Sequence, residues 1–456
     1  MKILLVNAID ERDVIDAPHL GLGYIAAYAR EHGGYTDIKI VESRIFQTLE
    51  DYKPDVVGIT SVSQNFDIAK VIAKRAKELG AVTIVGGVHV TLMPLSLGKS
   101  MDIAVISEGE VAFLTILQTI ERYGLDKEKL AEVKGIVYWD NGQLKFTQNG
   151  ELVPDVDTLP YPARDLIDYD WVIATMFTSR GCPFNCVFCS STRIWEKVRY
   201  HSPEYVVGEI RHLVEKYNTR HITFNDDLFI ANPKRAIQIA DLIEKEGLND
   251  KVTFNMSCRA NLVTDEVAAA LKKMNTELVS MGLESGSPTI LKFAKGPNIT
   301  VEDNMRAINI LKKHGVMTHG TFIIGFPMDT RETVLETLDF IKQSKLDSFE
   351  AYILAPMPGT PIWDYAVQKG FVSEDMEWSR IAHRNEYDFM EKIVLTENLA
   401  KEEMFELYNK FVAERKKRKA MHMLRNALKH PYRIPVYIRN RILPREHEMI
   451  KVRTVH

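Results

Sequence analysis

The sequence has little cysteine and no long apolar run. Cysteine accounts for 4 of the 456 residues, too few for a disulfide framework. No uninterrupted apolar run approaches the ~20 residues that span a bilayer. The opening stretch, MKILLVNAID, lacks the long apolar core and the cleavage site of a signal peptide. We therefore expect a cytoplasmic protein.

An excess of one charge is confined to the C-terminus. The formal net charge is −4, and residues 411–456 hold thirteen Lys or Arg against three Asp or Glu, an excess of +10. That leaves −14 for the first 410 residues, so nucleic acid is not expected as a partner of the whole chain. With 45% hydrophobic and 26% charged residues, the composition is that of a globular protein with more than one core.

Residues 1–145 alternate between apolar strands and helical patterns. Expected strands such as KILLVN, VVGITSVS and VTIVGG are separated by helical stretches that end in glycine. This order indicates a parallel sheet covered on both faces, a Rossmann-like domain that binds ligands at the carboxyl ends of its strands. The turn Asp140-Asn141-Gly142 predicts a hairpin. A Pro- and Asp-rich linker is expected over 146–170.

A second series of strands and helices begins at Trp171. Six strand–helix repeats over ~190 residues are too many for a small open sheet and too few for an eight-fold barrel. We therefore expect a partial (β/α)6 barrel over 171–388, followed by a helical, basic C-terminal extension over 389–456. The expected barrel strands are VIATMFTS, HITFND, VTFNMS, ELVSMGLES, MTHGTFIIGF and SFEAYILAP.

Three of the four cysteines share one loop directly after the first expected barrel strand. Cys182, Cys186 and Cys189 have C-x3-C-x2-C spacing. Three thiolates can hold three irons of a [4Fe–4S] cluster and leave the fourth iron open to another ligand. Zinc is the alternative, but a structural zinc site needs four ligands, and the nearest further candidate, His201, is twelve residues away. The cluster is favoured.

This loop resembles the signature of the radical S-adenosylmethionine (SAM) superfamily, with Phe188 in its aromatic position. The resemblance implies that the cluster cleaves SAM to methionine and a 5′-deoxyadenosyl radical, and that Phe188 packs on the adenine. Asp226 or Asp227, in FNDDLF, would bind the SAM amino group, although helix capping explains either one nearly as well. The same resemblance implies further SAM contacts at Ser257, Arg259, Glu284 and Gly325, while Cys258 is expected to be a buried thiol.

The N-terminal domain resembles the cobalamin-binding domain of class B radical SAM proteins, through PHLGLGYIAAYAREHG, TSVSQNF, GGVHVTLMP and SEGE. The resemblance covers residues 1–385. The chain lacks the Asp-x-His-x-x-Gly run that supplies a cobalt ligand in other cobalamin proteins. His89 is interpreted more readily as a packed loop histidine than as an axial ligand. The implied cobalamin contacts are Leu20, Gly21, Ser61, Ser63, Gly86, Gly87, His89, Glu108 and Gly109.

The family implies a radical SAM enzyme that methylates an unactivated carbon of a small molecule or lipid, with ferredoxin or flavodoxin as reductant. An oxidative cyclase of the Mg-protoporphyrin monomethyl ester type, or another radical C–C bond formation without methyl transfer, is the alternative. A methylthiotransferase is a third enzyme alternative, but the cysteine count argues against it, because members of that branch carry three further cysteines and only Cys258 remains. A binding protein with a structural cluster has only the basic tail in its support.

The C-terminal extension allows two interpretations. Met421, Leu424 and Leu428 form an apolar stripe amid cations. The extension is either a solvated helix packed on the barrel or a surface for anionic lipid headgroups, which would make the protein peripheral to the membrane.

Overall fold

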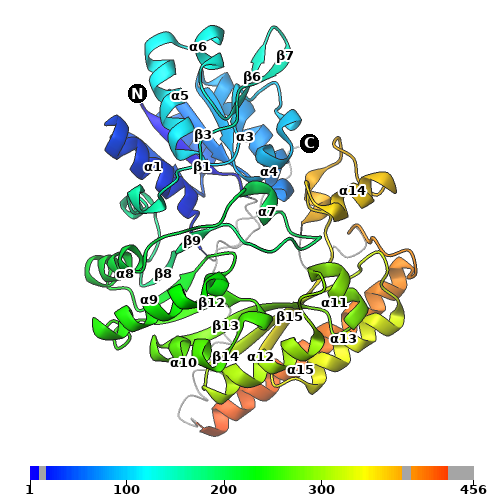
Figure 1. Ribbon diagram of the computed structural model, residues 1–456. Helices are drawn as coiled ribbons and strands as arrows, with labels where there is room; N and C mark the ends of the chain where they lie inside the picture. Colours follow the sequence, from blue (N-terminus) through cyan, green and yellow to red (C-terminus); the bar gives the residue numbers. More distant parts are fainter. Residues whose placement is uncertain (10–16, 383–391, 430–456) are drawn as a thin grey trace.

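The computed structural model describes residues 1–9, 17–382 and 392–429, without the side chains of 422–429. An N-terminal α/β domain lies above a second α/β domain, with the short helix α7 (Ser191–Ile194) between them (Figure 1). None of the helices in these ranges is long and apolar enough to cross a membrane.

The N-terminal domain contains a seven-stranded sheet in the order β2-β1-β3-β4-β5-β6-β7. The first five strands are parallel, and their order is that of doubly wound sheets that bind ligands where the strand order reverses. The last two strands form the predicted hairpin, with Asn141 at φ 48° and Gly142 at φ 77° as a type I′ turn requires. The strands are β1 (Ile3–Asn7), β2 (Ile38–Val41), β3 (Val56–Thr60), β4 (Val82–Gly86), β5 (Ile103–Val105), β6 (Ile136–Asp140) and β7 (Gln143–Phe146).

Helices cover both faces of this sheet, because neighbouring strand residues point to opposite sides. Ile3 and Leu5 pack with the helices of one face, whereas Leu4 and Val6 pack with those of the other. The first face carries α1 (Leu20–Gly33), α5 (Glu110–Tyr123) and α6 (Lys127–Ala131), and the second carries α2 (Ile45–Tyr52), α3 (Phe66–Glu78) and α4 (Val88–Leu92).

The second domain is the predicted partial barrel. Its six strands are all parallel and follow chain order, β8-β11-β12-β13-β14-β15, and within the described residues the first and last strands do not pair with each other. They are β8 (Ile173–Met176), β11 (His221–Phe224), β12 (Thr253–Cys258), β13 (Thr276–Glu284), β14 (Met317–Ile324) and β15 (Ser348–Ile353). The helices are α8 (Pro203–Tyr217), α9 (Pro233–Lys245), α10 (Asp265–Lys273), α11 (Pro288–Lys295), α12 (Val301–Lys313), α13 (Arg331–Gln343) and α14 (Pro361–Gln368).

Alternation along the barrel strands separates the core from the concave face. In β12, Phe254, Met256 and Cys258 are buried, whereas Asn255 and Ser257 between them are half-buried. The three buried side chains pack in the core, whereas Asn255 and Ser257 line a hollow of about 320 Å³. Cys258 is therefore the buried thiol that its position in the strand predicts.

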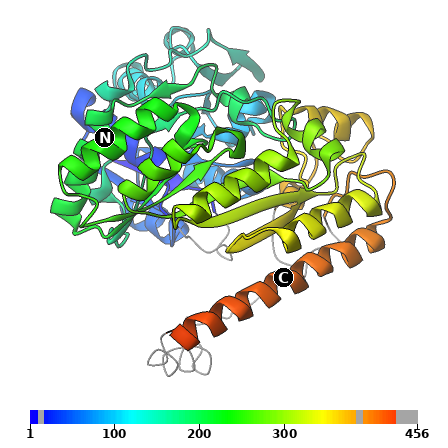
Figure 2. The ribbon, with the colours of Figure 1, turned by 60° about the horizontal axis from the view of Figure 1, so that its bottom comes forward.

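The C-terminal helix α15 (Lys401–Lys429) packs along β15 and α13 and then projects from the body (Figure 2). Two of its cations bind the barrel: Arg415 pairs with Glu350, and Arg418 donates hydrogen bonds to the backbone carbonyls of Ile341 and Leu346. Lys416, Lys417, Lys419 and Met421 are exposed. The side chains of Leu424 and Leu428, and all of residues 430–456, lie outside the described residues, so the predicted stripe stays a prediction, as do the domain boundaries.

Candidate active site

A cavity of about 810 Å³ lies between the two domains. The loops after β1, β3, β4 and β5 line it on one side, and the cysteine loop with the ends of β14 and β15 lines it on the other. The carboxyl edges of both sheets therefore face the same space, which is where parallel sheets bind ligands. The predicted residues that line it are Gly21, Ser61, Ser63, Gly86, Gly87, Glu108, Gly109, Phe188, Cys189 and Asp227.

Glycines keep the N-terminal wall of the cavity open. Gly87 has φ +95°, and a Cβ there would lie 2.7 Å from the Ser61 carbonyl oxygen and 2.7 Å from Thr60 Oγ1. Gly86, beside it, has no atom within 4 Å of the place where its Cβ would stand. Gly87 is therefore required by the close approach of the chain to itself, whereas Gly86 leaves open space at the cavity wall where a ligand can approach the backbone.

Two predicted cobalamin contacts, Leu20 and His89, do not line the cavity. The His89 ring is fully buried, stacked on Phe66 at 3.8 Å between centroids and edge-on to Trp378 at 4.4 Å. Neither ring nitrogen has a hydrogen-bond partner, and burial lowers the pKa of His89 to about 3. His89 is thus a neutral, packed histidine that lies in α4 and not in a loop, and its position argues against an axial-ligand role.

Glu108 belongs to a buried ion-pair cluster that joins the two domains. Its carboxylate accepts hydrogen bonds from Arg180 at 2.8 Å and from Arg199 at 2.6 and 2.8 Å. Arg180 also donates to Glu110 at 2.6 Å. Burial acts to raise the pKa of Glu108, but the hydrogen bonds from Arg199 and Arg180 outweigh it and hold the pKa below its usual value. We call Glu108, Glu110, Arg180 and Arg199 the interdomain clamp.

The cysteine loop connects β9 (Ser179–Arg180) to α7, and its backbone is fixed from two sides. The Val187 N–H donates to the Ala294 carbonyl at 3.1 Å, and the Val187 carbonyl accepts from Ile362 N–H at 3.3 Å. Cys186 is buried, whereas Cys182 and Cys189 are half-buried. Burial raises the pKa of Cys182 and raises that of Cys189 to about 11, so iron must displace protons to bind.

The thiols are not arranged around one point. Within the described ranges, no three His, Cys, Asp or Glu side chains are placed to hold a single metal ion. A [4Fe–4S] cluster does not require convergence on one atom, because each thiolate binds a different iron. The arrangement of the loop is therefore compatible with a cluster.

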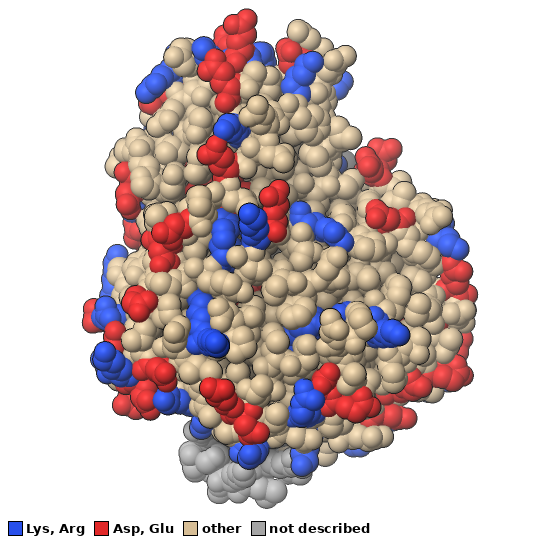
Figure 3. Space-filling model, in the orientation of Figure 1, with Lys and Arg blue, Asp and Glu red and all other residues tan. Residues whose placement is uncertain are grey.

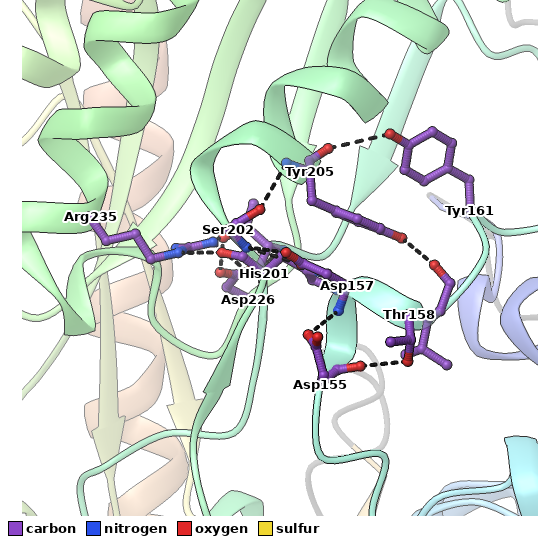
Figure 4. A network of polar contacts seen from close by, with 11 residues as sticks. Asp155, Asp157, Thr158, Tyr161, His201, Ser202, Tyr205, Asp226 and Arg235 are labelled. Atoms are coloured by element: carbon purple, nitrogen blue, oxygen red, sulfur yellow. Dashed lines mark hydrogen bonds and ion pairs between the residues drawn. The ribbon is translucent and has the colours of Figure 1, made fainter.

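Asp226 and Asp227 at the end of β11 have different surroundings. Asp226 is buried and accepts three hydrogen bonds, from Thr178 N–H, Thr178 Oγ1 and Ser179 Oγ, at 2.6 to 2.7 Å. Arg235 donates to the Thr178 carbonyl beside it, and the network continues through His201 to Asp157 in the linker (Figure 4). The hydrogen-bonding capacity of Asp226 is thus used by Thr178 and Ser179, which lead into the cysteine loop. Asp227 is exposed to the cavity and accepts from Ser191 Oγ at 2.6 Å.

The other predicted SAM residues lie at or near the carboxyl ends of the following barrel strands. Ser257 borders the smaller hollow. Glu284 is buried at the end of β13 with φ 59°, a strained conformation for a non-glycine residue, and lies 3.3 Å from Lys295 Nζ. Gly325 has φ +90°, and its N–H donates to Asp329 Oδ2 at 2.7 Å. Asp329 thus stabilises the turn after β14.

Arg259 faces the cysteine loop. Its Nη1 donates to Cys186 Sγ at 3.5 Å, and its guanidinium lies over the Phe184 ring at 4.0 Å from the centroid. Sequence reasoning placed this residue on SAM and missed its contact with Cys186. It also missed Arg180 and Trp195, which line the cavity; the only signal for Arg180 was its position two residues before Cys182.

The outer surface gives no sign of a nucleic-acid site on the face that Figure 3 shows. Lys and Arg are interspersed there with Asp and Glu, and the described residues form no extended basic area on that face. Mixed charge of this kind is typical of an ordinary solvated surface.

Two family matches agree with the fold and the cavity. Residues 176–341 match the radical SAM superfamily, and residues 13–117 match the B12 binding domain. An uncharacterized methyltransferase of Pyrococcus horikoshii is 36% identical over 405 residues, covering 83% of this chain and 86% of that protein. The chain therefore belongs to the radical SAM superfamily, and within it to the cobalamin-dependent methyltransferase family. It is an enzyme of a family whose cofactors are a [4Fe–4S] cluster, SAM and cobalamin.

The chain is also similar to more distant proteins. An anaerobic magnesium-protoporphyrin IX monomethyl ester cyclase of Cereibacter sphaeroides is 27% identical over 369 residues, covering 74% of this chain and 58% of that protein. The radical SAM methyltransferase TsrM of Kitasatospora setae, solved with cobalamin and a [4Fe–4S] cluster, has a TM-score of 0.69 at 18% identity, covering 82% of this chain and 76% of that one. The latter likeness confirms the predicted fold.

Proposed function

We propose that this enzyme methylates an unactivated carbon of a small molecule or lipid that enters the interdomain cavity. The observation that carries the proposal is the shared cavity, which Cys189 and Phe188 line from the barrel and Gly86 and Gly87 line from the N-terminal domain. Reductive cleavage of SAM would supply a radical that removes a hydrogen atom, and cobalamin would supply the methyl group. The protein positions these partners and excludes water.

The cluster would be held by Cys182, Cys186 and Cys189. For SAM we propose Phe188 and Asp227, which line the cavity, together with Ser257, Glu284 and Gly325 at the same edge of the barrel. Asp226 is proposed as a positioning residue, because its carboxylate already accepts three hydrogen bonds from the chain.

Cobalamin would lie against Gly21, Ser61, Ser63, Gly86, Gly87 and Gly109, which all line the cavity. His19 also lines it, but its Nδ1 accepts from Leu22 N–H at 3.4 Å. Binding of cobalt through Nε2 would require the ring proton to move to Nδ1, at the cost of this hydrogen bond. We therefore propose that no histidine of the described residues binds the cobalt.

The partners of the reaction are proposed by chemical class. Ferredoxin or flavodoxin is the expected one-electron reductant. The exposed Lys416, Lys417 and Lys419 of α15 would contact anionic headgroups if the substrate is a lipid. A cyclase reaction is the second candidate, and its support is the similarity to the magnesium-protoporphyrin cyclase.

SAM cleavage in the reconstituted chain tests the proposal. We expect dithionite-reduced wild type to form 5′-deoxyadenosine and Cys186→Ala to form none, because the described residues offer no other thiol beside the loop. Cys258→Ala is the matched control, since Cys258 is buried in the barrel core, and it should retain cleavage. Wild type that binds about four irons and cleaves no SAM would contradict the proposal.

Formation of S-adenosylhomocysteine separates the two candidate reactions. Transfer of the SAM methyl group leaves S-adenosylhomocysteine behind, whereas ring closure without methyl transfer does not. Product from SAM carrying a labelled methyl group should therefore retain the label, and unlabelled cyclised product would favour the second candidate.

A further inference from the structure

We propose that Arg259 raises the reduction potential of the cluster by donating a hydrogen bond to the Cys186 sulfur. The inference rests on the proposed assignment of the cluster to the cysteine loop. It gives Arg259 a role toward the cluster that the predicted SAM contact does not include.

Four contacts, two of them to the cysteine loop, fix the Arg259 guanidinium in place. Besides the 3.5 Å contact from Nη1 to Cys186 Sγ, Nη2 donates to the Lys295 carbonyl at 3.2 Å and Nε donates to Asn261 Oδ1 at 3.1 Å. The Phe184 ring, from the same loop, lies under the guanidinium at 4.0 Å. The cation is therefore held in place without any bound ligand.

The charge of Arg259 lacks a carboxylate partner. Only 5% of the residue is exposed, yet none of the ion pairs among the described residues includes it. A buried charge without a counter-charge is costly. Two other buried arginines do have carboxylate partners: Arg164 pairs with Glu209, and Arg180 pairs with Glu108 and Glu110. The negative group that Arg259 faces is Cys186, which is a thiolate when it binds iron.

Reduction adds one electron, and hence one negative charge, to the iron–sulfur site. A buried cation and an N–H···S hydrogen bond stabilise the more negative state, and both are known to set the potentials of iron–sulfur clusters. The electron comes from a one-electron donor such as flavodoxin or dithionite, and no proton is required. Arg259 should therefore ease reduction of the cluster before SAM is cleaved.

Redox titration of the reconstituted cluster, followed by electron paramagnetic resonance without SAM, tests the proposal. Arg259→Gln should have a more negative midpoint potential than wild type. Arg259→Lys keeps the charge and should lie between the two. Lys292→Gln is the matched control: it removes one positive charge from an exposed site on α11, where water screens it, and should leave the potential unchanged.

An unchanged potential in Arg259→Gln with wild-type iron content would overturn the inference. If Arg259→Gln does not assemble the cluster, Arg259→Lys decides, because it keeps the positive charge but loses the guanidinium that donates to Cys186 Sγ. A more negative potential supports the inference there, and an unchanged one overturns it. Wild type without iron would contradict the proposed function instead, so the two failures are distinguishable.

Discussion

Replacement of Arg180 should lower the free energy of unfolding, because this residue pairs with both carboxylates of the interdomain clamp. Its guanidinium lies 2.8 Å from Glu108 and 2.6 Å from Glu110, and all three side chains are at least nine-tenths buried. In Arg180→Met, Glu108 keeps Arg199 as a partner, whereas Glu110 loses its only ion pair among the described residues. The perturbation therefore leaves one buried carboxylate without a cation.

The cost follows from that uncompensated charge. Removing one partner of a buried ion pair typically costs about 3–5 kcal/mol. Glu110→Gln should cost less, because Arg180 retains Glu108 and glutamine still accepts a hydrogen bond. In the double variant the orphaned carboxylate is gone, so its cost should be smaller than the sum of the two single costs by about 1–3 kcal/mol.

Urea unfolding followed by tryptophan fluorescence measures these differences. Trp195, one of the five tryptophans, contributes to this signal beside the clamp, because its ring lies 6.0 Å from the Arg180 guanidinium and 5.6 Å from that of Arg199. Lys134→Met is the matched control, since it breaks an exposed ion pair with Glu151, and it should leave the midpoint unchanged. Strictly additive costs in the Arg180→Met/Glu110→Gln double variant would refute the reasoning.

Three further predictions concern single positions. Gly86→Val should leave thermal unfolding unchanged, since its Cβ meets no atom within 4 Å, but should lower cobalamin retention on gel filtration; unaltered retention would remove Gly86 from the site. His89 binds its proton only below about pH 3 when folded but near 6.5 when unfolded, so wild type should lose about 2 kcal/mol from this residue between pH 7 and pH 5. His89→Phe should lack that loss in urea titrations at the two pH values, and equal acid sensitivity would contradict it. Asp226→Asn should lower the free energy of unfolding by roughly 1–3 kcal/mol, whereas Asp227→Asn should unfold like wild type and bind SAM more weakly in equilibrium dialysis; the reverse pattern would exchange their roles.

The barrel and the cysteine loop could be predicted from the sequence because their signals are local. Strand alternation is visible within six residues, as in TFNMSC of β12, and three cysteines within eight positions indicate one loop. The clamp could not be predicted in this way, because Glu108 and Arg180 are 72 residues apart in the chain. No local pattern links a carboxylate in one domain to a cation in another.

Adjacent residues were equally hard to distinguish. Asp226 and Asp227 have the same chemistry and neighbouring positions, yet one is enclosed by Thr178 and Ser179 and the other faces the cavity. Similarly, GGVHVT does not reveal that Phe66 and Trp378, far away in the chain, enclose His89. Such outcomes depend on tertiary packing, which only the folded chain shows.

Cofactor content tests the central claim most directly. The chain would be expressed anaerobically with hydroxocobalamin and reconstituted, and iron, sulfide and cobalamin would be measured per chain. We expect about four irons and about one cobalamin per chain, and loss of the iron in Cys186→Ala but not in Cys258→Ala. Iron without cobalamin would contradict the assignment of the interdomain cavity, and a chain that binds neither would contradict the account as a whole.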